Sequence, residues 1–104
     1  MRAIEGDIGG LVVAQAATGD EVAFARIVAA HHDDMARVAF VVCHDAQMAH
    51  EAAHAAWPLA WRKLSTIRDP NKLRPWLLAI AANEARSLLR RRGRRRSGRS
   101  RWTR

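Results

Sequence analysis

The chain has only one cysteine, no tyrosine and no long hydrophobic run. The lone Cys43 excludes an internal disulfide framework and a zinc site built from several cysteines. No apolar stretch approaches the roughly 20 residues that a membrane-spanning helix needs. The first seven residues carry acids and lack the apolar segment of a secretory signal. We therefore expect a protein of the reducing cytoplasm, with no membrane partner.

The motifs of the common catalytic and cofactor sites are also missing. The chain contains no nucleophile elbow, no Walker loop and no dinucleotide-binding glycine fingerprint. We therefore expect no cofactor and no covalent chemistry. One alternative, a small zinc site, is treated below.

What the chain does contain is apolar residues at helical spacing. An apolar stripe from Phe24 to Val42 repeats at intervals of three and four residues, and the abundant alanines favour helix. No segment persuasively shows the alternation that predicts a strand. The sequence predicts an all-α fold, a small bundle of about four helices in one domain. We expect these helices over residues 8–17, from the cap at 18–21 to about 42, from 46 to about 64, and from about 73 to 91.

Caps and prolines refine these helices. Thr18 and Glu21 fit a capping box at the start of the long helix, and Asp45 can cap the helix after it. Pro75 is acceptable in the first turn of the last helix, where no intrahelical bond is lost. Pro58 differs, because a proline inside a helix removes a hydrogen bond and bends the chain. We expect a kink at Pro58, or two shorter helices that meet there.

Charge is distributed unevenly along the chain. Residues 1–85 carry eight basic and ten acidic residues, whereas residues 86–104 carry ten arginines and no acid. Such a basic end is typical of nucleic-acid contact, and the alternative is a solvated charge run that aids solubility. We expect a helical domain over residues 1–92 and a flexible, arginine-rich tail over residues 93–104, where glycine and serine accompany the arginines.

One short motif suggests metal chemistry. The run from His50 to His54 reads His-Glu-Ala-Ala-His, the pattern of a zinc peptidase in which Glu51 would act as the general base. Glu84 is the candidate third ligand. However, three fixed residues arise often by chance, and no strand is predicted that would hold a peptide. We therefore expect polar residues on an exposed helix face and no metal site, and keep His50, His54 and Glu84 as the alternative.

Basic and aromatic residues form a second constellation, around the polar loop 65–72 and along one side of the last helix. Arginines bind phosphates and aromatic faces accept unstacked bases, so this combination suits single-stranded or melted DNA. The alternative is that Trp61 and Trp76 are core residues, which we expect for most of each ring. The candidate DNA-binding residues are Arg68, Lys72, Arg74, Asn83, Arg86, Arg90 and Arg91.

Four segments of the chain, taken in order, look familiar as a set. They are residues 11–24, with Gly19-Asp20-Glu21-Val22-Ala23-Phe24 at their end; residues 31–42; residues 45–64, ending Ala60-Trp61-Arg62-Lys63-Leu64; and residues 73–92, beginning Leu73-Arg74-Pro75-Trp76-Leu77. Together they resemble region 2 of the extracytoplasmic-function sigma factors of bacterial RNA polymerase. The resemblance covers about residues 11–92 without large gaps.

The resemblance implies a helical domain with two partners. It implies that the helix over 46–64 docks on the clamp coiled coil of the polymerase β′ subunit, with Glu51, His54, Trp57 and Arg62 on or near that face. It implies that loop 65–72 and the last helix bind the −10 promoter element as it melts, with a base flipped into a loop pocket. By position, the resemblance places Arg68, Lys72, Asn83, Arg86, Ser87 and Arg90 near DNA. An anti-sigma factor is a further partner that the resemblance allows.

The chain departs from this family pattern at several positions. His54 stands where the family has a glutamine, Ala55 follows where an acid is usual, and Pro58 replaces a helix-favouring residue. After Arg92 the chain offers no segment long enough for region 4, the domain that reads the −35 element. We expect a sigma factor domain that is not an enzyme. The runner-up is a degenerate relative that binds nucleic acid or an anti-sigma factor without docking on polymerase.

Overall fold

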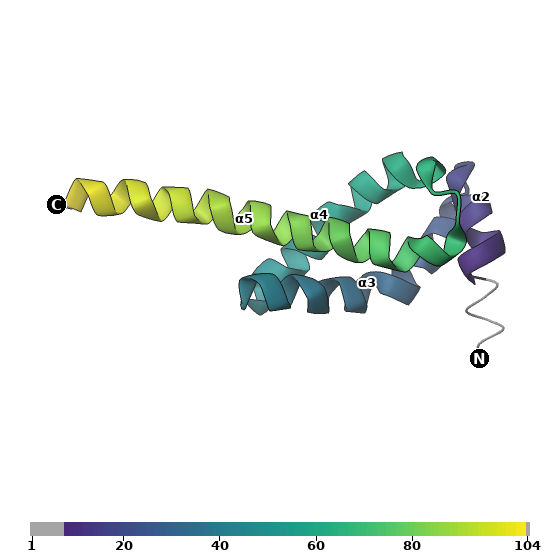
Figure 1. The fold of residues 1–104 in the computed structure, drawn as a ribbon, viewed down its shortest axis with the longest axis horizontal. Coiled ribbons are helices and arrows are strands. Elements are labelled where there is room, and N and C mark those ends of the chain that lie inside the picture. Colours follow the sequence, from purple (N-terminus) through teal and green to yellow (C-terminus); the bar gives the residue numbers. More distant parts are fainter. Residues whose placement is uncertain (1–7, 104) are drawn as a thin grey trace.

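The computed structural model describes the backbone of residues 8–103 and the side chains of residues 10–93. The chain forms a π-helical turn η1 (Ile8–Val12), helices α2 (Val13–Ala17), α3 (Glu21–Cys43) and α4 (Ala46–Lys63), two short 3-10 turns η2 (Leu64–Thr66) and η3 (Pro70–Lys72), and helix α5 (Leu73–Thr103). Figure 1 shows α3, α4 and α5 packed together, with α2 at the end of the bundle nearest the N-terminus. The predicted all-α fold is confirmed, and the described residues contain no strand.

The ends of the helices follow from local hydrogen bonds. Asp45 caps α4 as predicted, because its carboxylate accepts from the backbone N–H of Met48. The predicted capping box at α3 is wrong. Asp20 caps α3 instead, by accepting from the N–H of Ala23, while the Thr18 hydroxyl donates back to the Gln15 carbonyl. Thr18 therefore closes the preceding helix and does not begin the next one.

Helix α4 is one continuous helix through Pro58. Of the two expected arrangements, a pair of shorter helices is thus wrong. Pro58 is exposed to solvent, so its ring takes up no space on the packed side of the helix. The helix keeps its packed face on both sides of the proline, with Ala53 and Ala56 before it and Ala60 after it.

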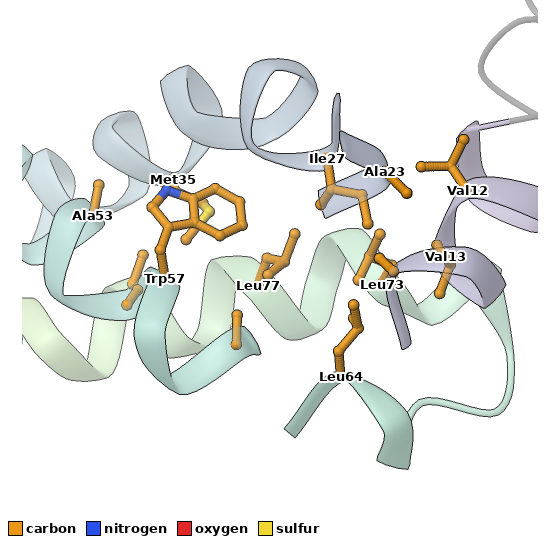
Figure 2. Close-up of a cluster of buried hydrophobic side chains, with 14 residues drawn as sticks. Val12, Val13, Ala23, Ile27, Met35, Ala53, Trp57, Leu64, Leu73 and Leu77 are labelled. Carbon is orange, nitrogen blue, oxygen red and sulfur yellow. The ribbon is translucent and has the colours of Figure 1, made fainter. Parts of the chain in front are cut away.

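The main core lies where α3, α4 and α5 meet, near the α2 end of the bundle. Figure 2 shows Trp57 of α4 among Met35 of α3 and Leu77 of α5, while Leu64 and Leu73 close the core towards η1 and α2. The ring of Trp57 meets Phe24 edge to face at a centroid distance of 5.6 Å. A second, smaller cluster joins the C-terminal end of α3 to α4 and α5 through Ala39, Cys43, Met48 and Ala85, among others. Cys43 is buried there as a small core residue.

Alanine makes up most of the packed face of α4. The buried residues of this helix are Met48, Ala49, Ala52, Ala53, Ala56, Trp57 and Ala60. Because the methyl side chain of alanine is small, the backbones of two helices that meet at alanines approach closely. Little room then remains for a larger side chain. The close packing of α4 against its neighbours therefore depends on alanine at these positions.

The arginine-rich end of the chain continues α5 beyond the expected boundary. The sequence predicts a helix end near Arg91, whereas the backbone is helical to Thr103. The side chains of residues 94–104 lie outside the described residues, so the flexible tail and the domain division at residue 92 stay predictions. Within the part of the chain that the structure describes, no helix is long and apolar enough to span a membrane.

The alanine-lined interface yields a stability prediction. Ala56→Leu adds three carbons at a fully buried position, and we expect it to lower the free energy of unfolding by about 1–3 kcal/mol. The matched control is Ala55→Leu on the exposed side of the same turn, with an expected change of about 0.5 kcal/mol or less. Urea unfolding followed by circular dichroism measures both. Equal effects of the two variants would contradict the close packing of α4.

Candidate functional site

The exposed side of α4 carries three of the four residues predicted to contact a protein partner. Glu51, His54 and Arg62 are all exposed, and their spacing of three and eight residues places them along one side of the helix. We call these three residues the α4 stripe. Their position opposite the alanine face leaves them accessible along almost the whole length of α4.

Trp57, the fourth predicted contact residue, lies in the core instead. Only 7% of its surface is exposed, and its ring belongs to the main hydrophobic cluster. Its indole Nε1 donates a hydrogen bond to Nδ1 of His32 on α3, at 3.0 Å. Trp57 therefore supports the α4 stripe from beneath and offers a partner little surface of its own.

Glu51 of the α4 stripe is joined to α5. Nη2 of Arg92 lies 2.8 Å from Oε1 of Glu51, and both side chains are roughly half exposed. At this exposure an ion pair contributes about 0–1 kcal/mol, because water screens the charges. The pair therefore adds little to the stability of the fold, and a competing charge can displace it.

Three histidines gather where α3 and α4 meet. The ring of His32 lies 6.0 Å from that of His50 and 5.1 Å from that of His54, measured between centroids. We call His32, His50 and His54 the histidine cluster. Burial lowers the pKa of His32, the neighbouring His54 and His50 lower it further, and Asp33 opposes them.

A second polar group joins α3 to the start of α5. The Nε and Nη2 atoms of Arg74 both donate to Oδ2 of Asp34, at 3.3 and 3.1 Å, and Arg37 contacts Oδ1 of the same carboxylate. Nearby, burial lowers the pKa of His31, with a further lowering from Arg74 and an opposing effect of Asp34. Arg74, predicted to contact DNA, is thus engaged within the fold.

The exposed face of α5 gathers four of the residues predicted to contact DNA. Asn83, Arg86, Ser87 and Arg90 recur at intervals of three and four residues, opposite the buried Leu77, Ala81 and Ala85. Nη1 of Arg86 donates to Oδ1 of Asn83 at 2.8 Å, which holds the guanidinium along the helix surface. Arg91 is also exposed and lies to one side of this face. We call Asn83, Arg86, Ser87 and Arg90 the α5 face.

The loop between α4 and α5 is compact. Buried Leu64 and Leu73 hold its two ends, and Asp69 accepts from the N–H of Asn71 to start η3. Arg68 and Lys72 are exposed on this loop, as their predicted contact with DNA requires. The loop is therefore a short, anchored segment with basic side chains on its outer side.

Of the tryptophans near the loop, Trp61 is the most accessible. It is 37% exposed and packs against Phe24 at a centroid distance of 4.6 Å, while Trp76 is partly buried against the main core. The expectation that most of each ring belongs to the core therefore fits Trp76 better than Trp61. Trp61 retains an exposed aromatic edge beside the loop.

The zinc alternative finds no support in the geometry. Among the residues searched, no group of three or more His, Cys, Asp or Glu side chains is placed to hold a metal ion. His50 and His54 do lie on one helix, but Glu84 does not join them in a ligand set. His50 and His54 instead face His32 across the α3–α4 contact.

Sequence reasoning missed three residues that organise these surfaces, namely His32, Asp34 and Arg92. Each forms a side-chain hydrogen bond with a residue 25 to 41 positions away in the chain. A local sequence pattern cannot reveal a contact over that separation. A weak signal did exist for His32 and Asp34. Both belong to the polar run His31-His32-Asp33-Asp34, which interrupts the apolar stripe of α3.

Comparisons with known proteins place the sequence of this chain in a family. The family model of sigma-70 region 2 matches residues 27–95, which include most of α3, all of α4, the loop and the described side chains of α5. RfaY, a probable RNA polymerase sigma factor of Xanthomonas campestris pv. campestris, is 34% identical over 75 residues, which are 72% of this chain and 19% of the relative. The chain thus spans about a fifth of the length of that relative.

No solved structure gave a significant match. The predicted resemblance to region 2 of sigma factors is confirmed, with the family model covering residues 27–92 of the predicted range 11–92, while the absence of a region 4 stays a prediction. Since the family model covers well over half of its length, the chain belongs to the sigma-70 region 2 family.

Proposed function

We propose that this chain is the part of a sigma factor that joins RNA polymerase core to the −10 element of a promoter. The α4 stripe binds the core enzyme, and the α5 face with loop 65–72 binds the −10 element as the duplex opens. The observation that carries the proposal is the match of residues 27–95 to sigma-70 region 2, which spans both surfaces. No catalytic chemistry is part of the proposal, and its place of action is the bacterial cytoplasm.

The α4 stripe suits a helical partner. Its charged residues, Glu51 and Arg62, lie on a rigid helix and have opposite sign, so they select a partner with complementary charges and fix its orientation. We propose the clamp coiled coil of the β′ subunit as that partner. Trp57 acts from beneath, because it holds α4 against α3 while the stripe makes the contact.

The α5 face suits a nucleic acid strand. Arg86 and Arg90 supply phosphate contacts, and Asn83 and Ser87 supply hydrogen bonds beside them. Arg68 and Lys72 extend the positive surface across the loop, and Trp61 gives an aromatic edge next to it. Base flipping costs a few kcal/mol, which stacking on an aromatic ring and contacts in a preformed loop can offset.

The first prediction concerns polymerase docking. Arg62→Ala should weaken binding of polymerase core by roughly three- to tenfold, because it removes a charge from the contact surface. Lys63→Ala is the matched control, since Lys63 is also exposed but lies off the stripe, and we expect less than a twofold change. Titration of core enzyme with fluorescently labelled chain, at about 0.2 M salt to screen nonspecific attraction, measures both. Equal losses for the two variants would argue against the α4 stripe.

The second prediction concerns the −10 element. In complex with polymerase core, Arg86→Ala or Arg90→Ala should weaken binding of a single-stranded −10 oligonucleotide, and each should lower the salt dependence by about 0.7 per lost phosphate contact. Arg26→Ala on α3 is the control, because it removes the same charge from an exposed position away from the α5 face. Fluorescence anisotropy at several salt concentrations gives affinity and slope together. The α5 face is the wrong surface if Arg26→Ala has the same effect.

A further inference from the structure

The histidine cluster has a feature that the proposed function does not use. Nδ1 of His32 accepts the N–H of the buried Trp57 at 3.0 Å, with the two rings inclined by only 21°. To accept, Nδ1 must carry a lone pair, so His32 is neutral and its proton is on Nε2. Trp57 can keep this hydrogen bond only while His32 stays in that form.

Protonation of His32 removes the acceptor. A doubly protonated imidazole has a hydrogen on each nitrogen, so two donors would face each other across 3.0 Å. The Trp57 N–H would then lose its partner inside the core, which is unfavourable for a buried polar group. The imidazolium would have to turn away, and the side-chain hydrogen bond that joins Trp57 of α4 to His32 of α3 would be lost.

The groups around His32 also influence whether its ring can be protonated. From α4, His50 and His54 face it at centroid distances of 6.0 and 5.1 Å, and both disfavour a positive charge on His32. On α3 itself, Asp33 is the opposing carboxylate. Two further acids close in sequence to members of the cluster are paired with arginines of α5, Asp34 with Arg74 and Glu51 with Arg92.

The cluster also borders the surface that is proposed to dock. His54 belongs to the α4 stripe, one turn after His50. His50 lines an open hollow of about 500 Å³ between α3 and α4, together with Phe40 and Val41 among others. A change in the charge or position of these rings therefore alters the exposed side of α4 directly.

We propose that the histidine cluster and Trp57 form a pH-sensitive switch, in which protonation of His32 releases Trp57 and weakens docking through α4. The docking half of this inference rests on the proposed function. The release of Trp57 is a property of the chain alone.

The direction of the switch follows from linkage. The pKa of His32 is below its ordinary value of 6.5 in the folded chain, so the folded state favours the neutral ring. Its contribution is complete above about pH 6.5 and is lost as the pH falls through the lower pKa of the folded state. The switch therefore holds Trp57 at neutral pH and releases it in mild acid.

The test has two readouts on the same protein. The first is the indole N–H resonance of Trp57, followed by nuclear magnetic resonance from about pH 7.5 to about pH 5 in the free chain. We expect it to titrate with a single midpoint below pH 6.5. A resonance that does not move over this range would overturn the proposal.

The second readout is the affinity for polymerase core over the same pH range. We expect binding to weaken by about fivefold or more in the unmodified chain. In His32→Asn the amide oxygen can replace Nδ1 as an acceptor but cannot titrate, so the change should be less than about twofold. His44→Asn is the matched control, because His44 lies at the end of α3 with a left-handed φ of 56° that asparagine tolerates, and it should retain the full pH dependence.

The two readouts separate failure of the switch from failure of the proposed function. If the chain binds core at no pH, the proposed function fails, and a Trp57 titration then supports the release step alone. If Trp57 titrates while core affinity is constant with pH, the docking half of the switch is overturned. Equal pH dependence in His32→Asn and the unmodified chain overturns the role of His32.

Discussion

The packing of α4 against α3 and α5 depends on a face made almost entirely of alanine, with Trp57 as its largest side chain. Alanine lets the helix backbones come close, and the tryptophan fills the space that remains near Met35 and Leu77. A buried indole N–H needs an acceptor, and His32 supplies it from α3. The contact that fills the core therefore also ties α3 to α4 by a directional bond.

The functional surfaces follow from this arrangement. Because alanine and Trp57 use one side of α4, the opposite side is left for Glu51, His54 and Arg62. In the same way, one side of α5 is buried in the core, and Arg86 and Arg90 lie on the exposed side. Exposed ion pairs, Arg74 with Asp34 and Arg92 with Glu51, then join α5 to α3 and α4 at the surface.

Much of the fold could be predicted from the sequence, because helical periodicity and caps are local. Asp45 and the limits of α4 follow from the residues around them, and the exposed positions of Asn83, Arg86 and Arg90 follow from their spacing. Long-range pairing could not be predicted, so the burial of Trp57 and the engagement of Arg74 by Asp34 were missed. The cap at Asp20 was missed because Thr18 and Asp20 are both good capping residues, and only the turn geometry distinguishes them.

Pro58 lies within α4, on its exposed side, without dividing the helix. A proline has no N–H, so the carbonyl oxygen of His54, four residues earlier, lacks the donor that an unbroken helix would give it. That oxygen belongs to a residue of the α4 stripe. The ladder of backbone hydrogen bonds in α4 is therefore interrupted once, at a residue of the stripe and not on the packed alanine face.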